Sequence, residues 1–449
     1  MFFYIVSIII LCIMIVCFII ALNNHNSNVK MNTNNISSNV IENSSSSNQE
    51  NVDINYSETI TTGGTYKIEG ENSCILINTD DSVTLELINA TINCDNGPAI
   101  NITSSKEVNI ILTGENTISS KTNEELNGAI YSKDNLTFSG TGSLKITSNL
   151  DGIVSKDNLI IKSGTYIINA QTDGIKGRDS VLIENGTFNI TAGEDGIKTT
   201  NDEDLSKGYI NINNGTFTIS SVGDGIQTET NLNIKNGTFI IKTTGNDSSK
   251  AIKAGKLITI DNGTYNINSQ DDGIHSNGNI TINKGKITIS SKDDAIHADG
   301  MVEINSGEIN LNAQEGIEGT YVKINNGNVV ISATDDGINA GRKSNDYSVK
   351  VEINGGNITI KMGQGDTDAI DSNGDIYITG GTINITGQSA FDYDGTAKYA
   401  GGTIIVNGVT TNQITNQMMG GRGNMDNNQK NNMNGNDFGQ RDGGGRRIR

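Results

Sequence analysis

The chain of 449 residues contains 53 Gly, a single Pro and no Trp, and only 34% of its residues are hydrophobic, which argues against several compact domains built on large cores. Its formal net charge is −19; the first 50 residues contribute −1 and residues 411–449 contribute +3, so residues 51–410 carry −21. Such an acidic surface repels nucleic acid and attracts cations, or ligands bridged by cations. Recurrent short runs of Ile, Val, Thr and Asn indicate strands and argue against a wholly disordered chain.

The first 22 residues, Met1 to Leu22, are apolar except for Ser7, and this length can span a bilayer. The segment lacks the charged start of a typical signal peptide, and neither Cys12 nor Cys17 follows the small residue of a usual lipoprotein cleavage site. We expect an uncleaved membrane anchor, ahead of a cleaved signal peptide or a lipoprotein leader. Each would place the chain outside the cytoplasm, at the cell surface or secreted. Residues 23–55 are rich in Asn and Ser and predict a flexible stalk.

A short acidic motif recurs along the chain at a nearly fixed spacing. One copy reads Asp-Asp-Gly-Ile-His at residues 271–275, and the next, 22 residues later, reads Asp-Asp-Ala-Ile-His. A second motif, Asn-Gly-Thr-Phe, keeps step with the first. Most repeats are 21 or 22 residues long, which predicts a solenoid. The isoleucines of the acidic motif are Ile153, Ile175, Ile197, Ile226, Ile252, Ile274, Ile296, Ile317, Ile338 and Ile370.

Each repeat contains three strand patterns separated by turn residues. In one repeat, residues 264–269 alternate apolar and polar, residues 273–276 form a short strand pattern, and residues 279–283 alternate again. Asn, Asp, Gly and Lys between them are typical of turns. Three short strands in about 22 residues predict one coil of an all-β, single-stranded parallel β-helix, with coils about 4.8 Å apart.

The β-helix is expected over residues 56–410. The longer repeats are explained as insertions in turns, at residues 201–207, 245–250 and 341–347. Residues 411–449 are rich in Gly, Asn, Met and Arg and show no strand or helix period, so they predict a disordered tail.

Two predictions concern the interior of the coils. The Phe and Tyr residues of the Asn-Gly-Thr-Phe motif alternate with Thr and Asn, so we expect them to stack in the core rather than to offer a platform for sugar rings. Cys74 and Cys94 are 20 residues apart, close to one coil, and stacking would bring their Cα atoms to about 5 Å, within the disulfide range. An extracellular location permits this bond, and two buried free thiols are the alternative.

Stacked coils would place the acid before each motif isoleucine in one row. Carboxylates about 5 Å apart repel by roughly 1 kcal/mol even at the dielectric constant of water, so the row needs counter-charge. Some coils add a second acid, which makes oxygen-rich clusters suited to Ca²⁺. The alternative is that Asp-Gly is simply a good turn, although the acid persists where alanine replaces glycine after Asp294 and Asp368. The expected Ca²⁺ ligands are Asp173, Asp195, Asp271, Asp272, Asp293, Asp294, Glu315, Asp335 and Asp336.

The residue after each motif isoleucine is expected to point outward. These positions hold Lys and then His, with acids further along the chain. Such a strip suits an extended polyhydroxylated or anionic polymer, whose carboxylates would share Ca²⁺ with the acids and pair with lysines. A transition-metal site at His275, His297 and Glu318 is an alternative, but two histidines without a fixed third ligand are more typical of a solvated row. The expected ligand-binding residues are Lys176, Lys198, Lys253, His275 and His297.

Taken together, these motifs resemble a known family. The Asp-Gly-Ile and Asp-Ala-Ile strands, the Asn-Gly-Thr-Phe strands, the apolar N-terminal segment and the Gly/Asn-rich tail are similar to clostridial calcium-binding, carbohydrate-binding β-helix proteins, over roughly residues 56–409. The resemblance implies a right-handed parallel β-helix with a pectate-lyase-like shape. It also implies extracellular binding of cellulose-type and acidic, pectin-like polysaccharides with calcium, and no established catalysis.

Binding of polysaccharide, acidic more than neutral, is the preferred function. A pectin lyase would need a base beside a calcium-bound uronate, and the best cluster for it is Lys176, Arg178 and Lys198 with Asp173 and Asp195. A polygalacturonase-like hydrolase would use paired acids, but its Gly-His-Gly and Arg-Ile-Lys elements are absent. A passive surface protein is the third possibility. The expected partners are a polysaccharide and, through the N-terminal segment, a membrane; we expect a monomer that binds no nucleic acid.

Overall fold

The computed structural model describes residues 56–364 and 367–417, and these residues form strands and turns without a helix. Their strands, from β1 (Tyr56–Ile60) to β42 (Val409–Thr411), belong to one continuous hydrogen-bonded sheet. Among the described strands every pairing is parallel, except the hairpin of β41 (Thr403–Val406) with β42. The prediction of an all-β, single-stranded parallel β-helix is confirmed.

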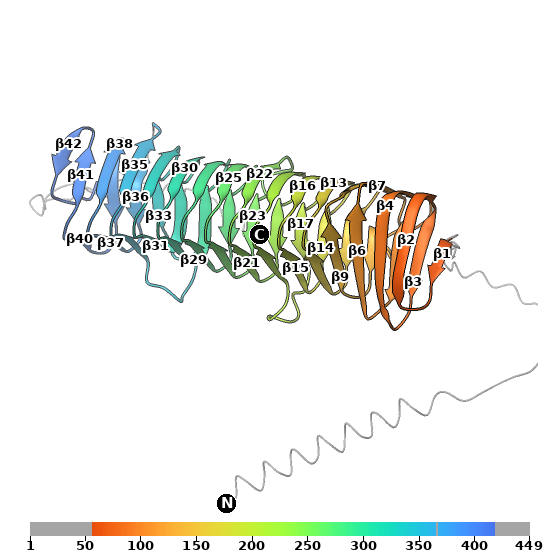
Figure 1. Cartoon of the computed structure of the whole chain (residues 1–449). Coiled ribbons are helices and arrows are strands. Elements are labelled where there is room, and N and C mark those ends of the chain that lie inside the picture. The colour runs from red at the N-terminus through yellow and green to blue at the C-terminus, as the bar shows by residue number, and fades with distance from the viewer. Residues whose placement is uncertain (1–55, 365–366, 418–449) are drawn as a thin grey trace, which may run out of the picture. The chain divides into compact units, whose positions relative to one another are not determined.

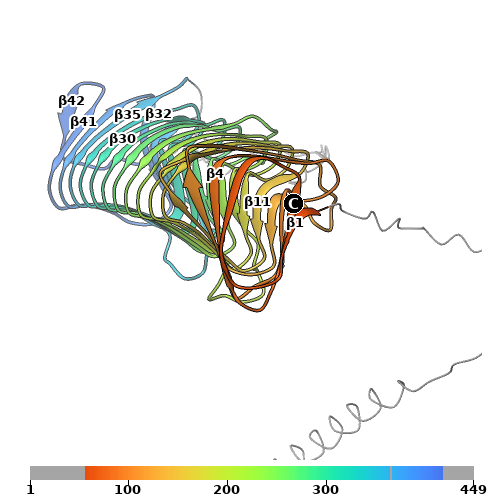
Figure 2. The same cartoon turned by 45° about the vertical axis from the view of Figure 1, so that its right-hand side comes forward.

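One coil shows the plan of the whole solenoid. It contains β13 (Thr165–Ala170), β14 (Ile175–Gly177) and β15 (Ser180–Ile183). Each strand pairs in register with its equivalent in the next coil, β16 (Thr187–Ala192) for β13 and β17 (Ile197–Thr199) for β14. The coils therefore stack in chain order and build three parallel stacks of strands (Figure 1), and Figure 2 shows the coils one behind another. We call the stacks that contain β13, β14 and β15 the first, second and third stack.

The motif isoleucines lie at the start of the strands in the second stack, and this stack carries the candidate site. Ile175 pairs with Ile197, and Ile274 with Ile296, so the sequence spacing is the true register of the coils. The described strands of this stack are β1, β3 (Cys74–Asn78), β5 (Ile100–Ser104), β8 (Gly128–Ser132), β11 (Asp151–Ser155), β14, β17, β20 (Ile226–Thr228), β23 (Ile252–Ala254), β26 (Ile274–Ser276), β29 (Ile296–Ile304), β31 (Ile317–Ile324), β33 (Ile338–Ala340), β36 (Asp368–Ser372) and β39 (Ser389–Tyr393).

Aromatic rings fill the interior beneath the first stack. Phe188, Phe217, Phe239 and Tyr265 lie face to face, with ring centroids 4.7–4.8 Å apart, and all four are buried. The prediction that these residues form the core is confirmed. The glycine of the motif serves the same packing: Gly215 has a φ of 145°, and a Cβ atom there would lie 2.8 Å from the ring of Phe217. Glycine is favoured at this turn for both reasons.

A disulfide joins the first coils. Cys74 and Cys94 are bonded, with their Cα atoms 5.0 Å apart, so the prediction from their spacing is confirmed. Closing a loop of this length stabilises a folded chain by about 3 kcal/mol, chiefly by restricting the unfolded chain.

Three loop insertions and the last described residues lie outside the regular coils. The longer repeats leave the sheet as loops at residues 200–208, 244–251 and 341–349. Residues 412–417, which the sequence assigns to the tail, still contact the last coils, since the backbone N–H of Gln417 donates to the carbonyl of Phe391 at 2.9 Å. Within the part of the chain that the structure describes, no helix could span a membrane. The expected anchor, the stalk and the rest of the tail lie outside the described residues.

The aromatic core gives a direct test of the fold. Phe239→Ala should destabilise the protein by about 3–5 kcal/mol, because it removes a buried ring that packs against two others. Ile240→Ala, on the same strand β22 (Thr238–Thr243) but 48% exposed, should change stability by about 0.5 kcal/mol or less. Urea unfolding of both variants measures the difference. Equal effects would contradict this arrangement of the strand.

Candidate functional site

Side chains from successive coils, most of them charged, form two parallel rows along the second stack, near the first residue of each strand. The acid row consists of the residues two positions before the motif isoleucines, and the outer row consists of the residues directly after them. The acid row holds Asp151, Asp173, Asp195, Asp224, Lys250, Asp272, Asp294, Glu315, Asp336, Asp368 and Ser389. The outer row holds Val154, Lys176, Lys198, Gln227, Lys253, His275, His297, Glu318, Asn339, Asp371 and Asp392.

The acids have a structural role that the sequence did not reveal. One carboxylate oxygen of Asp173 accepts a hydrogen bond from the backbone N–H of Asp195 in the next coil, at 3.0 Å. The same contact joins Asp195 to the N–H of Asp224 at 2.7 Å and Asp272 to the N–H of Asp294 at 3.1 Å. In these coils the acid therefore connects one coil to the next. Neither a good Asp-Gly turn nor a cation is needed to explain the row.

In the coils nearer the N-terminus, lysines of the outer row neutralise the acids of the acid row. Lys176 Nζ lies 2.5 Å from Asp151 Oδ2 and 2.8 Å from Asp173 Oδ2, and Lys198 Nζ lies 2.6 Å from Asp195 Oδ2. Burial lowers the pKa of Lys176, but Asp173 and Asp151 outweigh it and raise that pKa overall. The Lys176 side chain is only 13% exposed, against 23% for Lys198 and 33% for Lys253. Lys176 is thus an internal counter-charge, whereas the other two are accessible.

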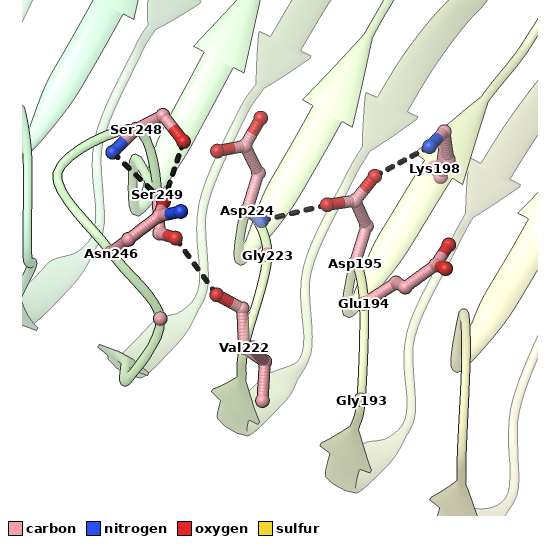
Figure 3. A pocket seen from close by; sticks show the side chains of 11 residues that line it. Gly193, Glu194, Asp195, Lys198, Val222, Gly223, Asp224, Asn246, Ser248 and Ser249 are labelled. Carbon is pink, nitrogen blue, oxygen red and sulfur yellow. Dashed lines mark hydrogen bonds and ion pairs between the residues drawn. The ribbon is translucent and has the colours of Figure 1, made fainter.

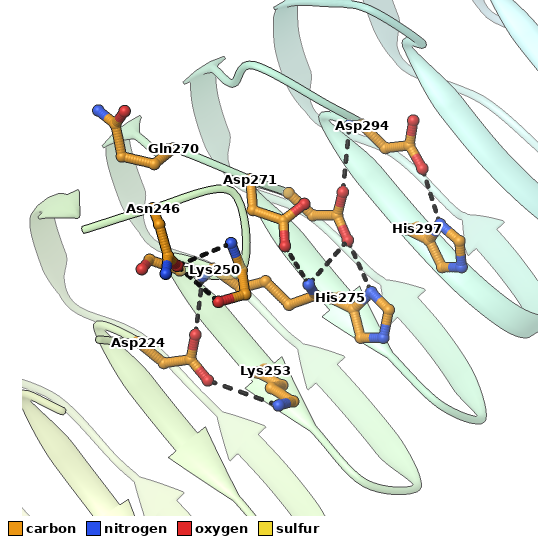
Figure 4. A network of polar contacts seen from close by, with 12 residues as sticks. Asp224, Asn246, Lys250, Lys253, Gln270, Asp271, His275, Asp294 and His297 are labelled. Carbon is orange, nitrogen blue, oxygen red and sulfur yellow. Dashed lines mark hydrogen bonds and ion pairs between the residues drawn. The ribbon is translucent and has the colours of Figure 1, made fainter. Parts of the chain in front are cut away.

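In the middle coils histidine replaces lysine (Figure 4). His275 Nδ1 lies 2.7 Å from Asp272 Oδ2, His297 Nδ1 lies 2.7 Å from Asp294 Oδ2, and the two rings stack with centroids 4.7 Å apart. Lys250, which interrupts the acid row, pairs through Nζ with Asp271 and lies 3.7 Å from Asp272 Oδ2. Asp271, Asp272 and Asp294 therefore each have a basic partner as well.

The last coils have acids in both rows. Within the described part of the chain, Lys, Arg and His form no ion pair with Asp336, Asp371 or Asp392. Burial and the neighbouring acids raise the pKa of Asp336 to about 6 and that of Asp371 to about 7. Asn339 is the outer-row residue of the coil that contains Asp336, and its Oδ1 atom is buried without a hydrogen-bond partner. This end of the rows is rich in oxygen and short of positive charge.

The remaining predicted acids are divided between these environments. Carboxylate oxygens of Asp271, Asp272 and Asp293 lie within 4.8 Å of one another, although Lys250 contacts the first two. Glu315 belongs to the acid-rich end: burial, Glu318 and Asp294 raise its pKa to about 8. Asp335 is half-buried in the same region. The predicted residues are thus brought into one strip, but their oxygens are not equally available.

Sequence reasoning overlooked Asp371 and Asp392 as site residues. Asp371 was recognised as an outward position but not as part of a carboxylate cluster. Asp392 was missed because Phe391 replaces the motif isoleucine in its repeat. The signal that could have found it is the 21-residue spacing from Ile370 to Phe391, together with the Ala that precedes the ring.

An open groove lies beside the rows where lysine is still accessible. Figure 3 shows it between the acid row and the 244–251 loop; its lining includes Asp195, Lys198, Asp224, Asn246 and Ser248. Its volume of about 410 Å³ falls in the range of ligand sites, which runs from about 300 to 1,000 Å³. The loop insertion thus adds amide and hydroxyl groups to a charged strip.

The proposed lyase cluster is not arranged for proton abstraction. Arg178 points to other acids, with Nη2 at 2.8 Å from Glu203 and Nη1 at 3.6 Å from Asp179. Although burial lowers the pKa of both Lys176 and Lys198, nearby aspartates including Asp173 raise it above its ordinary value overall. A lysine that keeps its proton cannot act as a general base at neutral pH.

A parallel β-helix with two charged rows on one side defines a repeat protein that presents an extended polar surface. The chain belongs to the family of carbohydrate-binding domain-containing proteins, whose sequence model matches residues 55–295 and 290–426. The resemblance seen in the sequence is confirmed. Among solved structures, a polysaccharide lyase-like protein from C. thermocellum, studied as a gadolinium derivative, is 27% identical, with 52% of this chain and 91% of that chain covered and a TM-score of 0.40. Comparison with curated proteins found no match.

The counter-charge role of Lys176 is testable. Lys176→Met should destabilise the protein by about 3–5 kcal/mol, because it leaves two buried carboxylates without their partner. Lys67→Met is the matched control: its ion pair with Glu86 is 3.8 Å long and its side chain is 65% exposed, so the change should be about 0.5 kcal/mol or less. Thermal and urea unfolding measure both. If the two variants are equally stable, Lys176 does not balance the acid row.

Proposed function

We propose that the protein binds acidic polysaccharide outside the cell, in a Ca²⁺-dependent manner, along the acid row and the outer row. The family supports carbohydrate binding in general. The observation that carries the finer proposal is the change of the outer row from lysine to acid along one strip, from Lys198 and Lys253 to Asp371 and Asp392. An anionic chain would meet fixed positive charge at one end and bridging cations at the other.

Lysines next to the groove would hold the carboxylates of the polymer. Lys198 and Lys253 are both partly exposed, and Lys198 lines the groove itself. A uronate near either ammonium group would add a charge-assisted hydrogen bond. Since the chain carries a net charge of −19, local positive charge is what allows an acidic polymer to approach.

Ca²⁺ fits the acid-rich end better than the lysine coils. In the lysine coils, one oxygen of Asp173 or Asp195 accepts a backbone N–H and the other contacts an ammonium group, so these predicted ligands are already engaged. Asp336 and Asp371 have no basic partner among the described residues, although one Asp336 oxygen accepts the backbone N–H of Asp368 at 3.1 Å, and the Oδ1 of Asn339 is buried without a hydrogen-bond partner. These are hard oxygen ligands, of which Ca²⁺ accepts six to eight. When bound, the ion would neutralise these acids and accept oxygens of a uronate. We therefore place the proposed ions at the last coils.

Neutral glycans should bind more weakly. The chain has no Trp, and the rings of the Asn-Gly-Thr-Phe motif are buried, so these rings cannot stack on sugars. Binding would then depend on charge rather than on ring contacts. An N-terminal membrane anchor would hold this strip at the cell surface.

Removing Ca²⁺ should lower the unfolding temperature, because a ligand that binds only the folded state stabilises it by about 2.7 kcal/mol at a hundred times its Kd. Asp336→Asn with Asp371→Asn should abolish the shift between chelator and CaCl₂. The control, Asp173→Asn with Asp195→Asn, should be less stable but keep the shift. Differential scanning calorimetry measures all three proteins. An unchanged midpoint of the unaltered chain in chelator would contradict the Ca²⁺ proposal.

Binding to polygalacturonate should require Ca²⁺ and weaken as salt rises, because exposed charge pairs are screened. Lys198→Ala with Lys253→Ala should lower the affinity by about tenfold, which is 1.4 kcal/mol. Lys242→Ala, an exposed change on the first stack, should not. Co-sedimentation with the polymer measures binding. Strong, salt-independent and chelator-resistant binding to cellulose alone would contradict the proposal, and unsaturated ends lost with Arg178→Ala would indicate a lyase.

A further inference from the structure

His297 stands where the basic coils give way to the acidic ones, and it meets two carboxylates at one nitrogen. Its Nδ1 atom lies 2.7 Å from Asp294 Oδ2 and 2.7 Å from Glu318 Oε2. Asp294 and His297 come from one coil and Glu318 from the next, and all three are mostly buried, with side chains 7–12% exposed. One ligand atom from each lies within 4.8 Å of the other two. His275 differs, since its Nδ1 contacts one carboxylate at this distance and its Nε2 faces the amide oxygen of Asn277.

The cluster holds three carboxylates against two basic groups, His297 and Lys343. A nitrogen of an imidazole carries one hydrogen at most, so Nδ1 cannot donate a separate hydrogen bond to each of two carboxylates. A third carboxylate, Asp299, lies 3.5 Å from Nε2 on the other side of the ring. Lys343 offsets one of these charges, and a second proton on the imidazole or a metal ion at Nδ1 would offset another.

Two neighbouring side chains, Lys343 and Asp299, orient the cluster as the hydrogen-bond partners of metal ligands do. Lys343 Nζ lies 2.7 Å from Glu318 Oε1, which orients that carboxylate and leaves Oε2 toward the histidine. Asp299 can accept the Nε2–H, and such a carboxylate behind a histidine fixes the tautomer in which the other nitrogen binds a metal. The Asp299 side chain is 40% exposed, so the cluster can be reached from solvent.

We propose that Asp294, His297 and Glu318 bind one divalent transition-metal ion of the Zn²⁺ class. Nδ1 of the histidine and one oxygen of each carboxylate are the protein ligands. An imidazole nitrogen favours Zn²⁺ or its neighbours over Ca²⁺, which takes oxygen ligands. Three protein ligands leave a position for water or for an oxygen of a bound glycan. This site is separate from the proposed Ca²⁺ ligands of the last coils, and it replaces His275 with Asp294 in the metal site considered from the sequence.

The test is a titration of the full chain, stripped with chelator, with ZnCl₂ in the presence of excess CaCl₂. Calorimetry and metal analysis should give one bound Zn²⁺ that Ca²⁺ does not displace. His297→Gln and Glu318→Gln should each weaken binding at least tenfold. The controls Glu308→Gln, an exposed carboxylate on the first stack, and Asp371→Asn should leave it unchanged. Circular dichroism of each variant shows whether it folds.

Co²⁺ gives a readout that does not depend on a variant. The unaltered chain should develop visible absorption bands with Co²⁺, at one equivalent, and Zn²⁺ should remove them. Absence of Zn²⁺ and Co²⁺ binding by the unaltered chain would overturn the proposal and leave a proton as the balancing cation. Equal loss of affinity in His275→Gln and His297→Gln would overturn the ligand set, because Asp272, His275 and His297 form the neighbouring cluster.

Discussion

A hydrogen bond between consecutive coils governs the chemistry of the candidate site. At six positions of the acid row the backbone N–H donates to the carboxylate of the coil before it, as Asp195 does to Asp173. The parallel register repeats this contact, so it buries a row of like charges along the solenoid. Buried carboxylates are costly unless positive charge lies close by. The side chain three residues later, in the outer row, therefore decides what each coil can bind.

The outer-row residue that lies beside each buried carboxylate differs along the chain. Lys176 forms ion pairs with two acids and is mostly buried, so its charge is not available to a ligand. Lys253 contacts Asp224 at 3.7 Å and remains one-third exposed. His297 is shared by two carboxylates, and beyond it Asp371 and Asp392 bring more negative charge. The strip thus presents lysine ammonium groups at one end and, at the other, carboxylates that lack a basic partner. An anionic polysaccharide that lies along the strip would use both ends.

The sequence predicted the register well because the repeated residues are the ones that pack. The isoleucine spacing, the aromatic stack from Phe188 to Tyr265 and the Cys74–Cys94 bond all follow from stacking equivalent positions. It predicted the site less well, because carboxylate availability depends on the direction of a backbone N–H and on depth. Spacing cannot show that Lys176 is enclosed while Lys253 is not. Nor can it show that Lys343, from a loop insertion, reaches Glu318.

The central claim is that charge balance within the two rows decides where external cations and anionic sugar are held. The most direct measurement is a crystal structure of the protein with CaCl₂ and an oligogalacturonate, with the ions located by anomalous scattering. We expect Ca²⁺ among Asp336, Asp371 and Asp392, and a uronate carboxylate within hydrogen-bond distance of Lys198 or Lys253. Ions bound instead to Asp173 and Asp195, with Lys176 and Lys198 displaced from their carboxylates, would contradict the claim.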